Sequence, residues 1–150
     1  VFTGGSDEQT VLRSIGSGMR TPPIDVGGQL DLESFAAVIS HAPLLISNNT
    51  GPTHIAAAVG TPVVVLYALT NPQHTPWGVP SRVLYHEVPC AFCYRSVFGI
   101  EGHPCLERVT PAEVVTAARE LMDQYGARKR AGAGVWSVSL IDTVTNRAVR

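Results

Sequence analysis

The stretch from Ile46 to Tyr67 constrains the fold of this 150-residue chain most, because turn-forming residues separate two apolar runs there. Residues 48–51 (Asn-Asn-Thr-Gly) tolerate a bent backbone, and Pro52 suits the first position of a helix. Gly60 can end that helix in the left-handed conformation, and Pro62 prevents it from resuming. The stretch therefore predicts a strand, a tight turn, a short helix, a sharp stop and a second, buried strand.

The predicted turn has the character of an anion site. It points backbone N–H groups and the positive end of a helix at one place above the sheet, and phosphate is the commonest occupant of such places. Thr50 can add a hydroxyl donor and His54 an imidazole. The same residues also fit a structural role, in which Thr50 caps the helix and His54 is a residue of its first turn without a ligand contact. The turn alone leaves both interpretations open.

Strands alternate with helices along most of the chain, which predicts an α/β fold with a doubly wound, mostly parallel sheet. The expected strands cover residues 1–3, 24–26, 43–47, 63–67 and 82–85. Capping signals mark three helix starts, at Ser6 with Gln9, at Asp31, and at Thr110 with Glu113.

Two turns follow predicted strands, the Gly4-Gly5 turn and the turn at residues 48–51. Ligands of such sheets bind outside the carboxyl ends of the strands. We therefore expect a ligand cleft at this edge of the sheet.

The central motif resembles the signature of glycosyltransferase family 9, the bacterial heptosyltransferases that build the inner core of lipopolysaccharide. The resemblance is carried by residues 47–58 (Ser-Asn-Asn-Thr-Gly-Pro-Thr-His-Ile-Ala-Ala-Ala), residues 60–64 (Gly-Thr-Pro-Val-Val) and Leu66-Tyr67, and it extends more loosely from Val1 to Tyr125. It implies a Rossmann-like sheet that forms the C-terminal, nucleotide-sugar-binding half of a two-domain GT-B enzyme.

The resemblance also implies a domain organisation. Residues 1–125 are expected to form the donor-binding domain without its first strand, because the opening Val-Phe-Thr-Gly-Gly looks like the inside of a domain and the chain like a fragment. The acceptor-binding N-terminal half, which carries the catalytic carboxylate in the family, is missing from this sequence. We therefore assign no catalytic residue in this chain.

We expect one set of residues to bind the nucleotide and its diphosphate, on the basis of the resemblance and of the chemistry of the turn. These residues are Gly4, Gly5, Glu8, Asn49, Thr50, Gly51, Pro52 and His54. Family members place an acid near Glu8 that contacts the ribose, although Asp7 and Glu8 equally fit a helix N-terminus. Asn49 stands where the family usually has Asp, which keeps the hydrogen-bonding shape but removes a charge and so bears on affinity or sugar choice.

The function implied by the resemblance is inverting, metal-independent transfer of a heptose or similar sugar, without a cofactor. The donor would be ADP-heptose or a related nucleotide sugar, and the acceptor a lipid-linked or oligosaccharide lipopolysaccharide precursor. No Asp-x-Asp motif, which metal-dependent transferases of the other major architecture use to hold a cation on the pyrophosphate, occurs in the sequence. The alternative is a non-catalytic or degenerate nucleotide-binding module that serves assembly.

The cysteines allow two interpretations. Cys90, Cys93, His103 and Cys105 have the residue types of a zinc site, but Phe98 stands where the family usually has another cysteine. The odd cysteine count also argues against a disulfide framework. Reduced, structural cysteines are the favoured interpretation and a metal site the other.

Charge separates the body of the chain from its end. Residues 1–125 carry 6 Lys and Arg against 11 Asp and Glu, whereas residues 126–150 carry 5 against 1. The acidic body argues against broad nucleic-acid binding. The basic segment reads as a poorly ordered, solvated tail, or alternatively as a contact for a membrane surface or a partner. No apolar run is long enough to span a bilayer, and the resemblance implies the cytoplasm or the inner face of the inner membrane.

Overall fold

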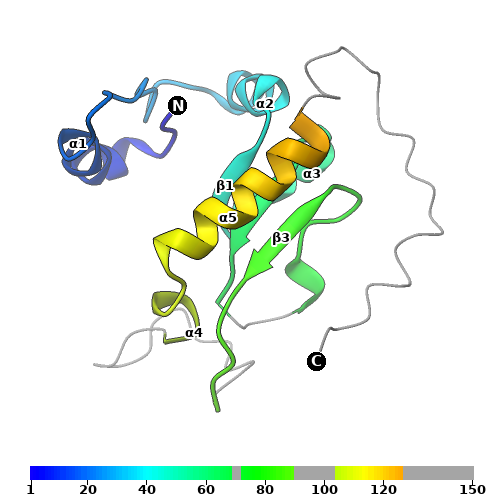
Figure 1. Ribbon diagram of the computed structural model, residues 1–150. Coiled ribbons are helices and arrows are strands. Elements are labelled where there is room, and N and C mark those ends of the chain that lie inside the picture. Colours follow the sequence, from blue (N-terminus) through cyan, green and yellow to red (C-terminus); the bar gives the residue numbers. More distant parts are fainter. Residues whose placement is uncertain (69–71, 90–103, 127–150) are drawn as a thin grey trace. The chain divides into compact units, whose positions relative to one another are not determined.

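A computed structural model of the chain describes residues 1–68, 72–89 and 104–126 (Figure 1). The chain divides into two compact units, Val1–Val38 and the part from Ile39 onward. In the described ranges, no helix has both the length and the apolar character needed to cross a membrane. Of the predicted tail at residues 126–150, only Gly126 belongs to the described residues.

The first unit contains a 3-10 turn at Ser6–Glu8 and helix α1 (Gln9–Ser17). The predicted strands at residues 1–3 and 24–26 are reduced to one parallel bridge, which joins Phe2 to Asp25. The predicted capping box of Ser6 and Gln9 is wrong, since Gln9 Nε2 donates to the carbonyl oxygen of Gly27 at 2.9 Å. This side chain therefore ties the start of α1 to a later loop.

Helix α2 (Leu32–His41) begins as the sequence predicts, with Asp31 as its cap. The Ser34 N–H donates to Asp31 Oδ1 at 2.8 Å. Hydrogen bonds from the Ser34 hydroxyl and N–H lower the pKa of the Asp31 carboxyl. Ile39 is the buried residue of this helix.

The second unit is built on a parallel sheet of β1 (Leu45–Asn48), β2 (Val63–Leu66) and β3 (Ser81–Leu84), in that order. The α/β class and the parallel direction of these strands are therefore confirmed. The three valines of β2 are fully buried, as expected for the central strand of a sheet covered on both faces.

Helix α3 (Gly51–Ala58) connects β1 to β2, and its end confirms the predicted stop. Gly60 has a φ of 73°, the Thr61 N–H donates to the Ala56 carbonyl at 2.8 Å, and the Gly60 N–H donates to the Ala57 carbonyl at 3.3 Å. These two bonds form a Schellman motif, which satisfies the last carbonyls of the helix. Because the helix begins at Gly51, Pro52 takes the second helical position and not the first.

Helix α5 (Pro111–Leu121) lies across the front of the sheet in Figure 1 and contacts β2 and β3, whereas α3 contacts β1 and β2. Val64, Ala117 and Leu121 form the centre of the core under α5. Burying a valine or leucine side chain such as those of Val64 and Leu121 stabilises a fold by roughly 1.5–3 kcal/mol each. Shorter elements complete the described part of the unit: Pro72–His74, α4 (Pro104–Glu107) and Met122–Gly126.

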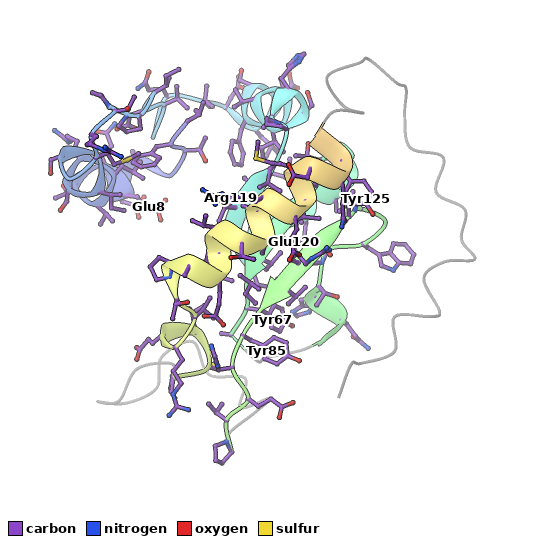
Figure 2. All side chains as sticks on the ribbon, viewed as in Figure 1. Glu8, Tyr67, Tyr85, Arg119, Glu120 and Tyr125 are labelled. Carbon is purple, nitrogen blue, oxygen red and sulfur yellow. The ribbon has the colours of Figure 1, made fainter. Side chains whose placement is uncertain are left out.

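The start of α5 confirms its predicted capping box. Thr110 Oγ1 accepts from the Glu113 N–H at 3.3 Å, and Glu113 Oε2 accepts from the Thr110 N–H at 2.7 Å. Farther along the helix, Glu120 Oε2 pairs with Arg82 Nε at 3.1 Å, which links α5 to β3 (Figure 2).

Candidate functional site

The carboxyl ends of the three strands lie at one edge of the sheet. The ladder continues past them, since the Asn49 N–H donates to the Leu66 carbonyl at 3.2 Å and the Tyr67 N–H to the Leu84 carbonyl at 2.8 Å. Figure 2 shows Tyr67 and Tyr85 at this end of the sheet. Tyr67 is buried and Tyr85 is partly exposed. The turn that follows β1 is therefore tied to the end of β2 by a backbone hydrogen bond.

Thr50 holds the cap position of α3 with extended backbone, at φ −137° and ψ −174°. Its side chain accepts no hydrogen bond from the helix, so the predicted capping role of the hydroxyl is wrong. The Thr50 N–H instead donates to the Asn48 carbonyl at 2.8 Å, and Thr50 Oγ1 lies 3.4 Å from the same oxygen.

The turn offers fewer free N–H groups than the sequence suggests. The N–H groups of Asn49 and Thr50 are bonded as described above, Pro52 has none, and the Thr53 N–H donates to the Thr50 carbonyl at 3.1 Å. Across residues 49–53, this leaves the Gly51 N–H as the one donor for which the described part of the chain supplies no partner. Gly51 is exposed, so this donor is open to a ligand.

Neither conformation nor packing explains why residue 51 is a glycine. Its φ is not in the left-handed region, unlike that of Gly60. A Cβ built on Gly51 would meet no atom within 4 Å. A glycine that the fold does not require is a typical sign of close approach by a ligand to the backbone.

Asn49, two residues before Gly51, carries a side-chain acceptor that no described residue satisfies. Its Oδ1 atom is buried and accepts no hydrogen bond from the described residues. Buried polar atoms are almost always hydrogen-bonded, so this exception calls for a donor other than the described residues. A hydroxyl group of a bound sugar has the chemistry to provide it.

His54 lies in the first turn of α3 with an exposed side chain. Its ring forms no hydrogen bond or ion pair within the described ranges, so it is available to a ligand at this end of the helix. Contact of His54 and Pro52 with a diphosphate stays a prediction.

Gly4, Gly5 and Glu8 belong to the first unit, whereas Asn49, Thr50, Gly51, Pro52 and His54 belong to the second. Glu8 Oε2 accepts from the Gly5 N–H at 2.7 Å, and a Cβ on Gly4 would lie 2.8 Å from the same oxygen. These glycines therefore make room for a carboxylate of the chain itself. This geometry matches the structural interpretation of Glu8, and its ribose contact stays a prediction.

The cysteine segment is described only in part, because Cys90, Cys93 and His103 lie outside the described residues. Cys105 is a buried free thiol. Within the ranges that the structure describes, no three His, Cys, Asp or Glu side chains are placed to hold a metal ion.

Sequence spacing does not indicate one further interaction, which lies at the carboxyl end of β3. His86 Nε2 lies 3.3 Å from Glu113 Oε1, and the His86 N–H donates to the Cys105 carbonyl at 2.8 Å. The pKa of Glu113 is lowered chiefly by hydrogen bonds from the Thr110 hydroxyl and N–H, with a smaller contribution from His86. Glu113 thus serves both the start of α5 and the segment that follows β3.

Comparisons with known proteins identify relatives of this chain in sequence and in fold. Lipopolysaccharide heptosyltransferase 3 of Escherichia coli is 36% identical over 74 residues, which are 47% of this chain and 22% of that protein. A crystal structure of a family 9 glycosyl transferase from Veillonella parvula matches with a TM-score of 0.70 at 28% identity, over 82% of this chain and 36% of the other. The structure of E. coli ADP-heptose lps heptosyltransferase II matches in fold with a TM-score of 0.65 at 23% identity, over 81% and 35%.

The chain thus spans well under half the length of these relatives. The family described as glycosyltransferase family 9 (heptosyltransferase) matches residues 1–98, which include the whole of the turn, α3 and β2. This chain belongs to glycosyltransferase family 9.

Proposed function

We propose that this chain is the donor-binding part of a cytoplasmic heptosyltransferase and binds ADP-heptose or a related nucleotide sugar through its diphosphate. The names of its relatives support this class of enzyme. Gly51 is the single observation that carries the proposal. It presents an unpartnered N–H at a helix N-terminus, and the fold itself does not need a glycine there.

In the proposed reaction, a hydroxyl of a lipopolysaccharide-type acceptor attacks the anomeric carbon of the sugar with inversion, and the nucleoside diphosphate leaves. Negative charge grows on the leaving phosphate. The Gly51 N–H and the positive end of α3, equivalent to about half an elementary charge, would stabilise that charge. Removing one such preorganised donor costs roughly 3–4 kcal/mol in other enzymes.

The turn suits a diphosphate that binds without a metal ion. Asn49, Thr50, Gly51 and His54 offer neutral or basic groups and no carboxylate that would repel the anion. The general base would come from the acceptor-binding half of the enzyme. The buried Asn49 Oδ1 would accept a hydrogen bond from the sugar.

Calorimetry of the 150-residue chain with ADP tests the proposal, after circular dichroism has established that the chain is folded. We expect ADP to bind with the same affinity with and without EDTA. Loss of binding in EDTA would refute metal-free binding. A folded chain that binds no ADP at all would refute the assignment of the site.

A second candidate is a nucleotide-binding module without transferase activity. It is favoured by Asn49, which stands where the family usually has Asp. Transfer of heptose from ADP-heptose to a lipopolysaccharide precursor, assayed with the protein purified from its native host, distinguishes the two. The module would bind ADP and transfer nothing.

A further inference from the structure

The carbonyl oxygen of Asn48, the last residue of β1, receives an unusual number of donors. The Thr50 N–H and Thr53 Oγ1 both lie 2.8 Å from it, and Ser47 Oγ lies 3.0 Å away. A carbonyl oxygen has two lone pairs. Together with the more distant Thr50 Oγ1 at 3.4 Å, these donors saturate it.

The bond from Thr53 is not the one that a helical threonine usually makes. A threonine hydroxyl inside a helix ordinarily donates to the carbonyl three or four residues back. Thr53 Oγ1 reaches five residues back, out of α3 and onto the end of β1. Its side chain is fully buried, so a valine would fill the same volume, and only the hydroxyl ties the helix to the strand.

This tie determines what the turn presents at the sheet edge. With its lone pairs occupied by Thr53 and its neighbours, the Asn48 carbonyl is held toward the buried hydroxyl. The Gly51 N–H is then the polar backbone group left open in the turn. A carbonyl free to turn toward the same place would present the negative end of its dipole to a phosphate and weaken phosphate binding.

We propose that Thr53 is a positioning residue for the diphosphate: its hydroxyl fixes the Asn48 carbonyl, and through it the Gly51 N–H. The inference rests on the proposed function, because it concerns the same site. This role does not require Thr53 to contact the ligand, since the Thr53 side chain is buried and its hydroxyl is already bonded within the protein.

Thr61 provides a matched control at the other end of α3. It is also fully buried, and its Oγ1 donates to the Ile39 carbonyl at the same distance of 2.8 Å. Replacing either threonine by valine removes a hydrogen bond of the same kind at constant volume. The two variants should therefore lose comparable stability, and only one should affect the ligand.

The experiment compares Thr53→Val, Thr53→Ser and Thr61→Val with the unmodified 150-residue chain. ADP and adenosine affinities are measured by calorimetry below the unfolding midpoint of every variant. We expect Thr53→Val to bind ADP about tenfold more weakly, which corresponds to about 1.4 kcal/mol. Adenosine affinity should stay unchanged, Thr53→Ser should restore ADP binding, and Thr61→Val should bind ADP normally.

Ser47→Ala removes a second donor from the same carbonyl and should weaken ADP binding in the same direction, which keeps the inference testable if Thr53→Val does not fold. Equal ADP affinities in the unmodified chain and in Thr53→Val or Ser47→Ala would overturn the inference and leave the proposed function intact. A parallel loss of ADP and adenosine affinity would also overturn it. Failure of the unmodified, folded chain to bind ADP would refute the proposed function itself.

Discussion

Replacing Gly51 by alanine should change the stability of the fold and the affinity for the ligand in different directions. The φ of Gly51 lies outside the left-handed region, and a Cβ there meets no atom within 4 Å. Replacing a glycine by alanine under such conditions stabilises a protein by about 0.4–1 kcal/mol, mainly because the unfolded chain becomes less flexible. We therefore expect Gly51→Ala to unfold at the same or a slightly higher temperature.

The same substitution should impair ligand binding. A phosphate oxygen that accepts from the Gly51 N–H would lie about 2.9 Å from the nitrogen, and an added methyl group would crowd the other phosphate oxygens. A hydrogen bond to a charged group contributes roughly 1.5–3 kcal/mol, which is about a ten- to hundredfold change in affinity. We expect calorimetry to give an ADP dissociation constant at least tenfold higher for Gly51→Ala.

Gly60→Ala gives the opposite pattern and serves as the control. Gly60 has a φ of 73°, a conformation that costs a residue with a Cβ about 1–2 kcal/mol. This variant should therefore lose stability while the ADP affinity of its folded form stays normal. If Gly51→Ala binds ADP as tightly as the unmodified chain, the diphosphate does not approach Gly51, and the reasoning from the unneeded glycine is wrong.

Two further substitutions test the histidine of the turn and the shared carboxylate of α5. His54→Ala should weaken ADP binding at least tenfold, since a hydrogen bond to a charged group contributes roughly 1.5–3 kcal/mol. Calorimetry that gives the same ADP affinity as for the unmodified chain would return His54 to a structural role, and His41→Ala, at another exposed histidine, is the control. Because hydrogen bonds from Thr110 lower the pKa of Glu113 in the folded state, its carboxylate stabilises the fold above the ordinary glutamate pKa and loses this effect as the pH falls through its own pKa. The unfolding temperature should therefore fall less between about pH 7 and pH 3 in Glu113→Gln than in the unmodified chain, and equal falls would contradict the role of Glu113.

Local chemistry made the central stretch predictable from the sequence. Pro52 and Pro62 restrict the backbone strongly, and Gly60 permits the left-handed conformation that ends a helix, so the order of strand, turn, helix and stop follows from residue types alone. The Schellman motif at Gly60 confirms this order. The capping box of Thr110 and Glu113 was predictable for the same reason, since all its partners lie within four consecutive residues.

Side-chain partners distant in sequence, or chosen among several options, could not be predicted. Gln9 fits a capping box by spacing, but its amide bonds Gly27, a partner eighteen residues away that spacing does not indicate. Thr50 looks like a cap by residue type, yet its hydroxyl faces the Asn48 carbonyl. Which donors a turn leaves free depends on which of them the turn itself uses, and only the geometry decides that.

The neutral amide of Asn49 fits the rest of the turn better than a charged residue would. A carboxylate about 4 Å from a phosphate would cost roughly 4 kcal/mol per pair of unit charges at the effective dielectric of a protein surface. The single N–H of Gly51 and the end of α3 would have to offset that cost without a cation. With asparagine, the same position offers a buried acceptor that carries no net charge. Under the proposed function, asparagine in place of the family's usual aspartate would remove a repulsion from the diphosphate and keep one acceptor for a sugar hydroxyl, so the change would favour diphosphate binding at this turn.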